Sequence, residues 1–316
     1  MQRLTGFDAG FLYMETPTLH MHTLKISILD VSGVPGGYTF ERFKEVLGER
    51  LHLLPPFRRR MVEVPLGLHH PVWIEDPDFD LDYHVRRVVA PAPGGLEELS
   101  VVCSDIASRQ LDRRHPLWEI SVVEGLEDGH IGFVAKIHHS AADGIAAAAM
   151  LSSVLETEPT DQPPPPPATP WKPDRVPGQW ELLVGALIAI LRNILALPNL
   201  LKRTVQGFTR VRAHRRQAEV QPPLPLTAPK LSFNRSLTPH RDFVMTSMPL
   251  DDFKRVKSAF GVTVNDVFLG VCAGALRRYL ERTGQLPAKP LVAGVPVSTR
   301  GEDSADYIAN SVSNMF

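Results

Sequence analysis

The chain has 316 residues, of which 43% are hydrophobic and 22% are charged, and its formal net charge is -1. This length favours two packed domains, and the charge balance gives no general signal for nucleic-acid binding, so we expect no nucleic-acid partner. The two cysteines, Cys103 and Cys272, lack the spacing of a zinc site or a disulfide framework. Together with the absence of an early apolar run, this predicts a cytoplasmic protein without a metal site.

Strands and helices alternate over residues 1–157, which predicts a first domain of mixed α and β structure. In chain order, the predicted elements are a strand at 24–28, helices at 41–51 and 96–110, strands at 117–124 and 130–138, and a helix at 144–155. The last two strands are predicted to form a hairpin, because Asp128-Gly129 supplies the backbone freedom of a tight turn. Asp143 stands at the expected N-cap of the final helix.

The composition changes at 158–178, where an unbroken proline run excludes helix and central strand. We therefore predict an extended, mobile linker. Residues 179–218 are first strongly apolar and then basic, and regular elements resume in the segment 235–316. Helices are predicted at 251–260 and 265–282, and a strand at 291–297. This segment is interpreted as the start of a second domain.

The predicted strand at 130–138 leads to adjacent histidines, His138 and His139. Neighbouring side chains in a strand point to opposite faces, so one of the two should face a substrate, and a shared metal site is disfavoured. A histidine at the end of a strand can accept a proton from a hydroxyl group at physiological pH. Gly144 would permit close backbone approach, and Asp143 would cap a helix or pair with an arginine at 58–60. The alternative is that both histidines are structural.

Several motifs carry a family resemblance. The segment Lys136-Ile137-His138-His139-Ser140-Ala141-Ala142-Asp143-Gly144 resembles the HHxxxDG signature of the superfamily that includes chloramphenicol acetyltransferase and condensation domains. Pro116-Leu117-Trp118-Glu119 resembles the PLW motif of one branch, the bacterial wax ester synthase/diacylglycerol acyltransferases. Segments 4–13, Val264-Asn265-Asp266-Val267 and 295–300 support the same branch.

The resemblance implies a two-domain CoA-dependent acyltransferase fold with a tunnel between the domains. It implies transfer of a fatty acyl group from acyl-CoA, as co-substrate and without a cofactor, to diacylglycerol and also to long-chain alcohols. In such enzymes the second histidine, here His139, acts as general base, and no covalent acyl-enzyme forms. His138 would then be supportive, and Asp143 would be largely structural.

Other matched positions have less specific roles. Asn265 and Asp266 match the family's ND pair, and Asn265 either caps a helix or lies near the active site. Leu117 and Trp118 are interpreted mainly as packing residues, and Pro116 as a substrate-binding or site-supporting residue of the same motif. Ser298 and Arg300 are assigned to the acyl or CoA channel. Segment 310–316 resembles a strand after which the family sequence continues, so we expect an incomplete second domain whose remainder is a separate polypeptide.

The apolar stretch at 180–201 is nearly long enough to span a bilayer, but Arg192 and Pro198 interrupt it. An interfacial helix fits better, with the basic residues at 202–216 facing anionic headgroups or CoA phosphates. We therefore expect peripheral association with a membrane or lipid droplet. The alternative is a helix pair that packs on the protein's own second domain.

Two other functions remain open from the sequence. One is a condensation-type acyltransferase that takes its acyl group from a carrier protein. The other is a lipid-droplet or membrane binding protein without catalytic turnover.

Overall fold

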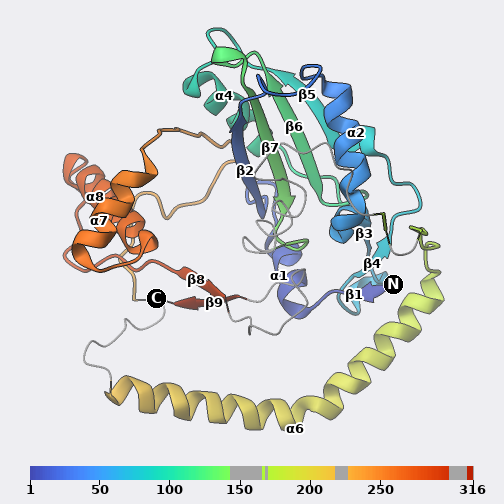
Figure 1. The fold of residues 1–316 in the computed structure, drawn as a ribbon. Coiled ribbons are helices and arrows are strands. Elements are labelled where there is room, and N and C mark those ends of the chain that lie inside the picture. Colours follow the sequence, from blue (N-terminus) through green and yellow to red (C-terminus); the bar gives the residue numbers. More distant parts are fainter. Residues whose placement is uncertain (143–165, 168–169, 218–226, 299–311, 316) are drawn as a thin grey trace.

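The computed structural model describes residues 1–142, 166–167, 170–217, 227–298 and 312–315 (Figure 1). Its strands are β1 (Gln2–Arg3), β2 (His22–Leu29), β3 (Arg59–Val62), β4 (Val72–Glu75), β5 (Val85–Val89), β6 (Trp118–Glu124), β7 (Ile131–His138), β8 (Val295–Ser298) and β9 (Val312–Met315). Its α-helices are α1 (Gly6–Met14), α2 (Phe40–Arg50), α3 (Leu81–His84), α4 (Leu96–Ala107), α6 (Gln179–Gln217), α7 (Leu250–Phe260) and α8 (Val264–Arg282). The predicted mixed α and β architecture is confirmed.

The central sheet has four strands in the order β2-β7-β6-β5. β7 pairs antiparallel with β2 on one side and with β6 on the other, whereas β5 and β6 are parallel. The predicted hairpin between β6 and β7 is present, and its turn is the 3-10 segment Glu127–Gly129. Asp128 and Gly129 both have positive φ, at 59° and 70°, which is the backbone freedom that Asp-Gly was expected to supply.

Two separate apolar clusters cover the central sheet. Phe133 on β7 packs with Leu47 of α2 in one cluster, whereas Val134 packs with Leu99 of α4 in the other (Figure 1). Successive strand residues therefore bury opposite faces. Every residue of β7 is buried, which explains why this strand reads as a nearly continuous apolar run.

A smaller sheet has its strands in the order β1-β4-β3, and the segment that follows the proline run contacts it. The backbone of Asp174 donates to the carbonyl of Glu75 at 3.0 Å, and the indole of Trp171 donates to the Glu75 carboxylate at 2.8 Å. These polar contacts place Trp171 and Asp174 against β4, and the mobility of the linker stays a prediction. Most of 158–169 lies outside the described residues.

A ladder of serine hydroxyls on α4 binds a segment far away in the sequence. Ser104 and Ser108 each donate to the carbonyl four residues earlier, at 2.7 Å. The same oxygens accept the backbone N–H groups of Phe243 and Arg241, both at 2.9 Å. Two residues of extended chain span about the same length as four residues of helix, so the two spacings match. Phe243 consequently packs on the α4 cluster.

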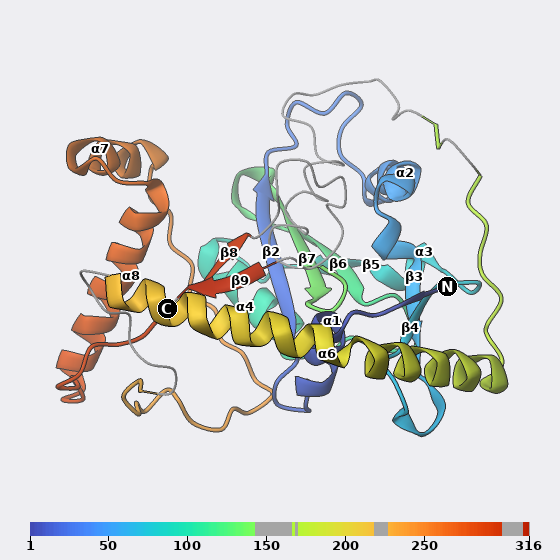
Figure 2. The same ribbon diagram turned by 90° about the horizontal axis from the view of Figure 1, so that it is seen from below.

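The long helix α6 leaves the small sheet and runs along the underside of the molecule (Figure 2). Its first turns are packed, since Leu182 and Ala186 are buried, and Leu182 contacts the apolar residues of β4. Residues 191–213 are exposed on all sides. The predicted helices after the linker are also present as α7 and α8, and Gly261, with a φ of 65°, ends α7.

Candidate active site

The end of β7 places the two histidines in different surroundings. His138 closes the strand and is buried, with 1% of its surface exposed, whereas His139 is half-buried. The backbone N–H of His139 donates to the carbonyl of Met21 at 2.8 Å, just beyond the His22–His138 pair of the β2–β7 ladder. Met21 has a φ of 46°, a conformation that costs about 1 kcal/mol in a residue with a side chain. The backbone of His139 is thus held by a strained neighbour.

His138 is fixed as a neutral side chain. Its Nδ1 accepts the backbone N–H of Ser140 at 3.0 Å and lies 2.7 Å from the Ser140 hydroxyl. Burial, with smaller effects from Arg113, His22 and His139, lowers the pKa of His138 to about 3. With Nδ1 acting as an acceptor, the ring proton belongs on Nε2. His138 is therefore neutral at neutral pH, and its Nδ1 is occupied by Ser140.

Two side chains from the N-terminal segment contact the histidine pair. The ring of Phe11 stacks on His139, with centroids 4.9 Å apart and planes at 17°. The Glu15 carboxylate lies 3.8 Å from Nε2 of His138 and forms an ion pair with Arg113. Phe11 belongs to the 4–13 segment that carried the family resemblance, but no sequence pattern identified Glu15 or Arg113.

The PLW segment supports the site by packing and by its backbone. The carbonyl of Leu117 accepts the N–H of His138 at 3.0 Å. The Trp118 ring is stacked between Phe57 and His84, with centroid distances of 4.3 and 4.4 Å, and its indole donates to the Phe57 carbonyl at 2.8 Å. Pro116 is buried as well. These contacts agree with the interpretation of Leu117 and Trp118 as packing residues.

The ND pair has a local role at the start of α8. Thr263 is the N-cap, and the Asp266 carboxylate accepts both its N–H at 2.8 Å and its hydroxyl at 2.7 Å. These bonds lower the pKa of Asp266. The alternative in which Asn265 caps the helix is wrong, because Asn265 lies inside the first turn. Both Asn265 and Asp266 are exposed.

Several expected site residues lie outside the described part of the chain, namely Asp143, Gly144 and Arg300. Ser298 is the last residue of β8. Of the arginines considered as partners for Asp143, Arg59 pairs with Glu75 at 2.7 Å and Arg60 with Asp76 at 3.1 Å. Arg58 lies over the Trp171 ring, and its pairing with Asp143 stays a prediction. Among the described residues, no group of His, Cys, Asp and Glu could hold a metal ion.

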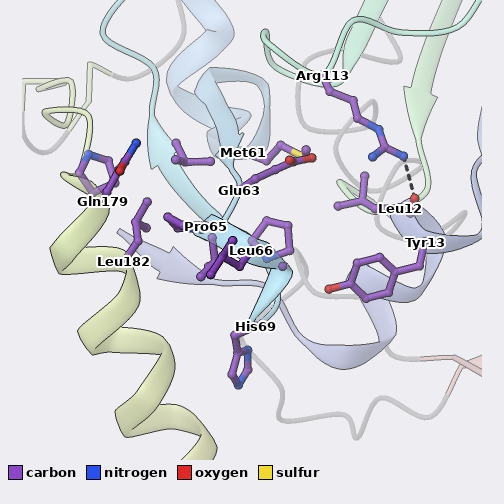
Figure 3. Close-up of a pocket in the computed structure, with 15 residues that line it drawn as sticks. Leu12, Tyr13, Met61, Glu63, Pro65, Leu66, His69, Arg113, Gln179 and Leu182 are labelled. Atoms are coloured by element: carbon purple, nitrogen blue, oxygen red, sulfur yellow. Dashed lines mark hydrogen bonds between the residues drawn. The ribbon is translucent and has the colours of Figure 1, made fainter.

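A half-open cavity of ≈ 590 Å³, with both apolar and polar lining residues, shares Leu12 and Arg113 with the surroundings of this site (Figure 3). Leu12, Met61, Leu66 and Leu182 line it, and Arg113 lies at its edge. The Arg113 guanidinium donates to the Leu12 carbonyl at 2.7 Å. The volume is in the range of pockets that take small apolar ligands. A second cavity of ≈ 280 Å³ is lined by Ser140 and Ala141, directly after the histidine pair.

Residues 4–268 match the wax ester synthase/diacylglycerol acyltransferase catalytic domain. The chain belongs to this family. Two Mycobacterium tuberculosis proteins assigned as diacylglycerol O-acyltransferases are 42% and 41% identical to it, over 94% of this chain and 63% and 62% of theirs. A wax ester synthase/diacylglycerol acyltransferase from Marinobacter aquaeolei VT8 has a similar structure, with a TM-score of 0.63 and 29% identity over 94% of this chain and 65% of that one. This family member thus spans about three fifths of the length of its curated relatives.

The similarity to the Marinobacter structure agrees with the predicted acyltransferase fold class. The division of the chain into a first domain, a linker, a helical segment and the start of a second domain stays a prediction.

Proposed function

We propose that this family member is an O-acyltransferase that moves a fatty acyl group from acyl-CoA to diacylglycerol, and also to long-chain alcohols, with His139 as the general base. The observation that carries the proposal is the contrast within the histidine pair. His138 is buried and neutral, whereas His139 stands half-exposed beyond the strand end. Family membership supplies the reaction class.

In this mechanism His139 removes the proton of the acceptor hydroxyl as the oxygen attacks the thioester carbonyl. The tetrahedral intermediate collapses to the ester and expels the CoA thiolate, which takes the proton from the His139 imidazolium. The proton therefore moves from the alcohol to the leaving thiol, and His139 returns to its neutral state. No covalent acyl-enzyme and no cofactor are required.

The cavity beside Arg113 offers apolar side chains to the hydrocarbon part of a lipid substrate, from Leu12, Met61 and Leu182. A bound acyl chain would cover this half-open surface and displace water from it. Removing water from an acyl-transfer site also protects the thioester from hydrolysis.

The test is the release of free CoA from palmitoyl-CoA with diacylglycerol or hexadecanol as acceptor. We expect acceptor-dependent release by the native protein and a loss of at least about a hundredfold in His139→Ala. His240→Ala removes an exposed histidine and is the matched control. Folded protein that releases no CoA with either alcohol would contradict the proposal, and a carrier-protein thioester in the same assay would test the condensation alternative.

We further propose that α6 lies on an anionic membrane or lipid-droplet surface. One described helix segment, Gln179–Ala213, is long and apolar enough to cross a membrane by length and composition alone. Its exposed apolar side chains include Leu195 at 73% and Phe208 at 72%. Basic residues follow along the same helix, and no acidic residue occurs between Leu182 and Gln217. A shallow position in the headgroup region satisfies both features.

Flotation with phosphatidylcholine vesicles, with and without phosphatidylglycerol, tests this surface. Each basic residue at an anionic surface contributes about 1 kcal/mol, so Arg203→Ala/Arg210→Ala should weaken binding roughly thirtyfold. Lys254→Ala in α7 is the control for loss of an exposed positive charge. No binding by the native chain would contradict the proposed membrane surface, and equal binding by all variants would contradict the role of the basic residues of α6.

A further inference from the structure

α1 and the residue after it present a row of side chains to the histidine pair. Phe7, Phe11 and Glu15 are four residues apart, and residues at this spacing lie on the same face of a helix. Phe11 reaches His139, and Glu15, which is the C-cap residue of α1, reaches His138. One short element therefore contacts both rings at the end of β7.

The contact between Phe11 and His139 is a near-parallel stack, 4.9 Å between centroids. Phe7 supports it from behind, with its edge on the Phe11 ring at 5.3 Å and 90°. Stacking restricts rotation of the imidazole about its side-chain bonds. The face of an aromatic ring also attracts a positive charge. Because His139 becomes an imidazolium when it takes the hydroxyl proton, the stack should stabilise the transition state more than the resting state.

The contact between Glu15 and His138 is the buried end of a polar network that reaches the surface at Gln110 and Arg113. Only 4% of the Glu15 side chain is exposed, and Arg113 donates to its carboxylate through Nε at 2.7 Å. Gln110 donates to the other carboxylate oxygen at 3.4 Å. Nε2 of His138, which carries the ring proton, has no hydrogen-bond partner among the described residues, and the nearest carboxylate oxygen is that of Glu15 at 3.8 Å. A negative group that is itself held in place therefore faces the ring proton of His138.

We propose that Phe11 and Glu15 are positioning residues for acyl transfer: Phe11 fixes the ring plane of the base His139, and Glu15, held by Arg113, fixes the neighbouring His138. This inference rests on the proposed function for its catalytic consequence. It also assigns a role to the 4–13 segment, which carried the family resemblance without a known purpose in this chain.

Phe11→Leu removes the stack and keeps an apolar side chain of similar size. A lost cation–π contact of about 0.5–2 kcal/mol corresponds to a fall in kcat of about 2- to 30-fold, with KM changed less than about twofold. Phe11→Trp keeps an aromatic face and should retain most of kcat. Phe260→Leu, at a site with 77% exposure in α7, is the matched control. Unchanged kcat in folded Phe11→Leu, or a raised KM alone, would overturn the role of Phe11.

Glu15→Leu alone would leave the half-buried Arg113 guanidinium without its partner, so a loss of activity could reflect the unpaired charge and not the position of His138. The informative variant is Glu15→Leu/Arg113→Leu, which removes both charges, alongside Glu15→Gln, which keeps an oxygen acceptor. We expect a folded double variant with kcat reduced about tenfold or more, and Glu15→Gln close to the native value. A folded double variant with native kcat would overturn the role of Glu15.

An NMR measurement separates this inference from the acyltransferase proposal. The Phe11 ring face should shift the His139 ring-proton resonances upfield in the native chain and in Phe11→Trp. In Phe11→Leu the resonances should move to unshielded values. Native protein that shows these shifts and yet transfers no acyl group would contradict the proposed function and support the positioning geometry. Unshielded His139 resonances in the native chain would overturn the geometry itself.

Discussion

Buried His84 should make the first domain sensitive to acid. The ring is stacked between Trp118 and Phe79, at 4.4 and 5.5 Å, and its Nδ1–H donates to the Trp118 carbonyl at 2.8 Å. Burial is the main cause that lowers the pKa of His84 from 6.5 to about 4. The unfolded chain therefore binds a proton between these two values, whereas the folded chain does not.

The free energy of unfolding consequently falls as the pH decreases below about 6.5. A difference in pKa of one unit corresponds to about 1.4 kcal/mol, so His84 should cost about 2 kcal/mol of stability at pH 5. The loss should level off near about 3 kcal/mol below pH 4. The pKa values of His22 and His138 are also lowered by burial, to about 4 and about 3, so the native chain should lose more than this in total.

Urea denaturation followed by tryptophan fluorescence at pH 8, 6.5, 5.5 and 5 isolates the effect of His84. His84→Phe keeps a ring between Trp118 and Phe79 but cannot take a proton. The stability difference between pH 8 and pH 5 should be about 2 kcal/mol smaller in this variant than in the native chain. His240→Gln, which alters an exposed histidine, should leave the difference unchanged. An equal pH dependence in native protein and His84→Phe would refute the reasoning.

Four further variants test the packing of the first domain, all by urea denaturation. Gly94→Ala would place its Cβ 2.1 Å from a backbone oxygen at a φ of +90° and should cost about 3 kcal/mol or more, whereas Gly129→Ala, at a φ of +70° in open space, should cost only about 1–2 kcal/mol. Trp118→Ala should cost about 3–5 kcal/mol, because it empties the centre of a ring stack. Ser104→Ala removes the acceptor of the Phe243 N–H and should cost about 1 kcal/mol, with faster amide exchange at Phe243 as a second measurement. Equal losses of unfolding free energy in the two glycine variants would contradict the close contact at Gly94. A loss below about 1 kcal/mol in Trp118→Ala would contradict the ring stack, and unchanged amide exchange at Phe243 would contradict its bond to Ser104.

The sequence predicts local structure well where one periodicity or one turn signal dominates. The β6–β7 hairpin follows from alternating burial and Asp128-Gly129, and α2, α4, α7 and α8 follow from helical spacing. The opposite placement of His138 and His139 follows from strand geometry alone. These features depend on residues that are close together in the chain.

Contacts between residues that are far apart in the sequence could not be predicted in this way. Arg113 meets Glu15 across 98 positions, and Arg241 meets Ser108 across 133. Neither pair has a local pattern that marks it. The cap of α8 stays open from the sequence because Asn265 and Thr263 are both good caps, and only the backbone conformation distinguishes them. The contacts of Trp171 and Asp174 with β4 have no local signal either, because proline content reports on hydrogen-bonding capacity and not on contacts with another sheet.

The serine hydroxyls of α4 fix the register of the extended segment 241–243, which follows the linker and α6 in the chain. Side chains alternate in the extended segment, so Phe243 faces the α4 cluster and Val244, with 96% exposure, faces solvent. A slip of one residue against Ser104 and Ser108 would bring the carboxylate of Asp242 to the apolar cluster. An insertion before Arg241 leaves the register of this segment unchanged, whereas an insertion between Arg241 and Phe243 shifts it. We therefore expect homologous proteins to differ in the number of residues before Arg241 but to keep one residue between Arg241 and Phe243.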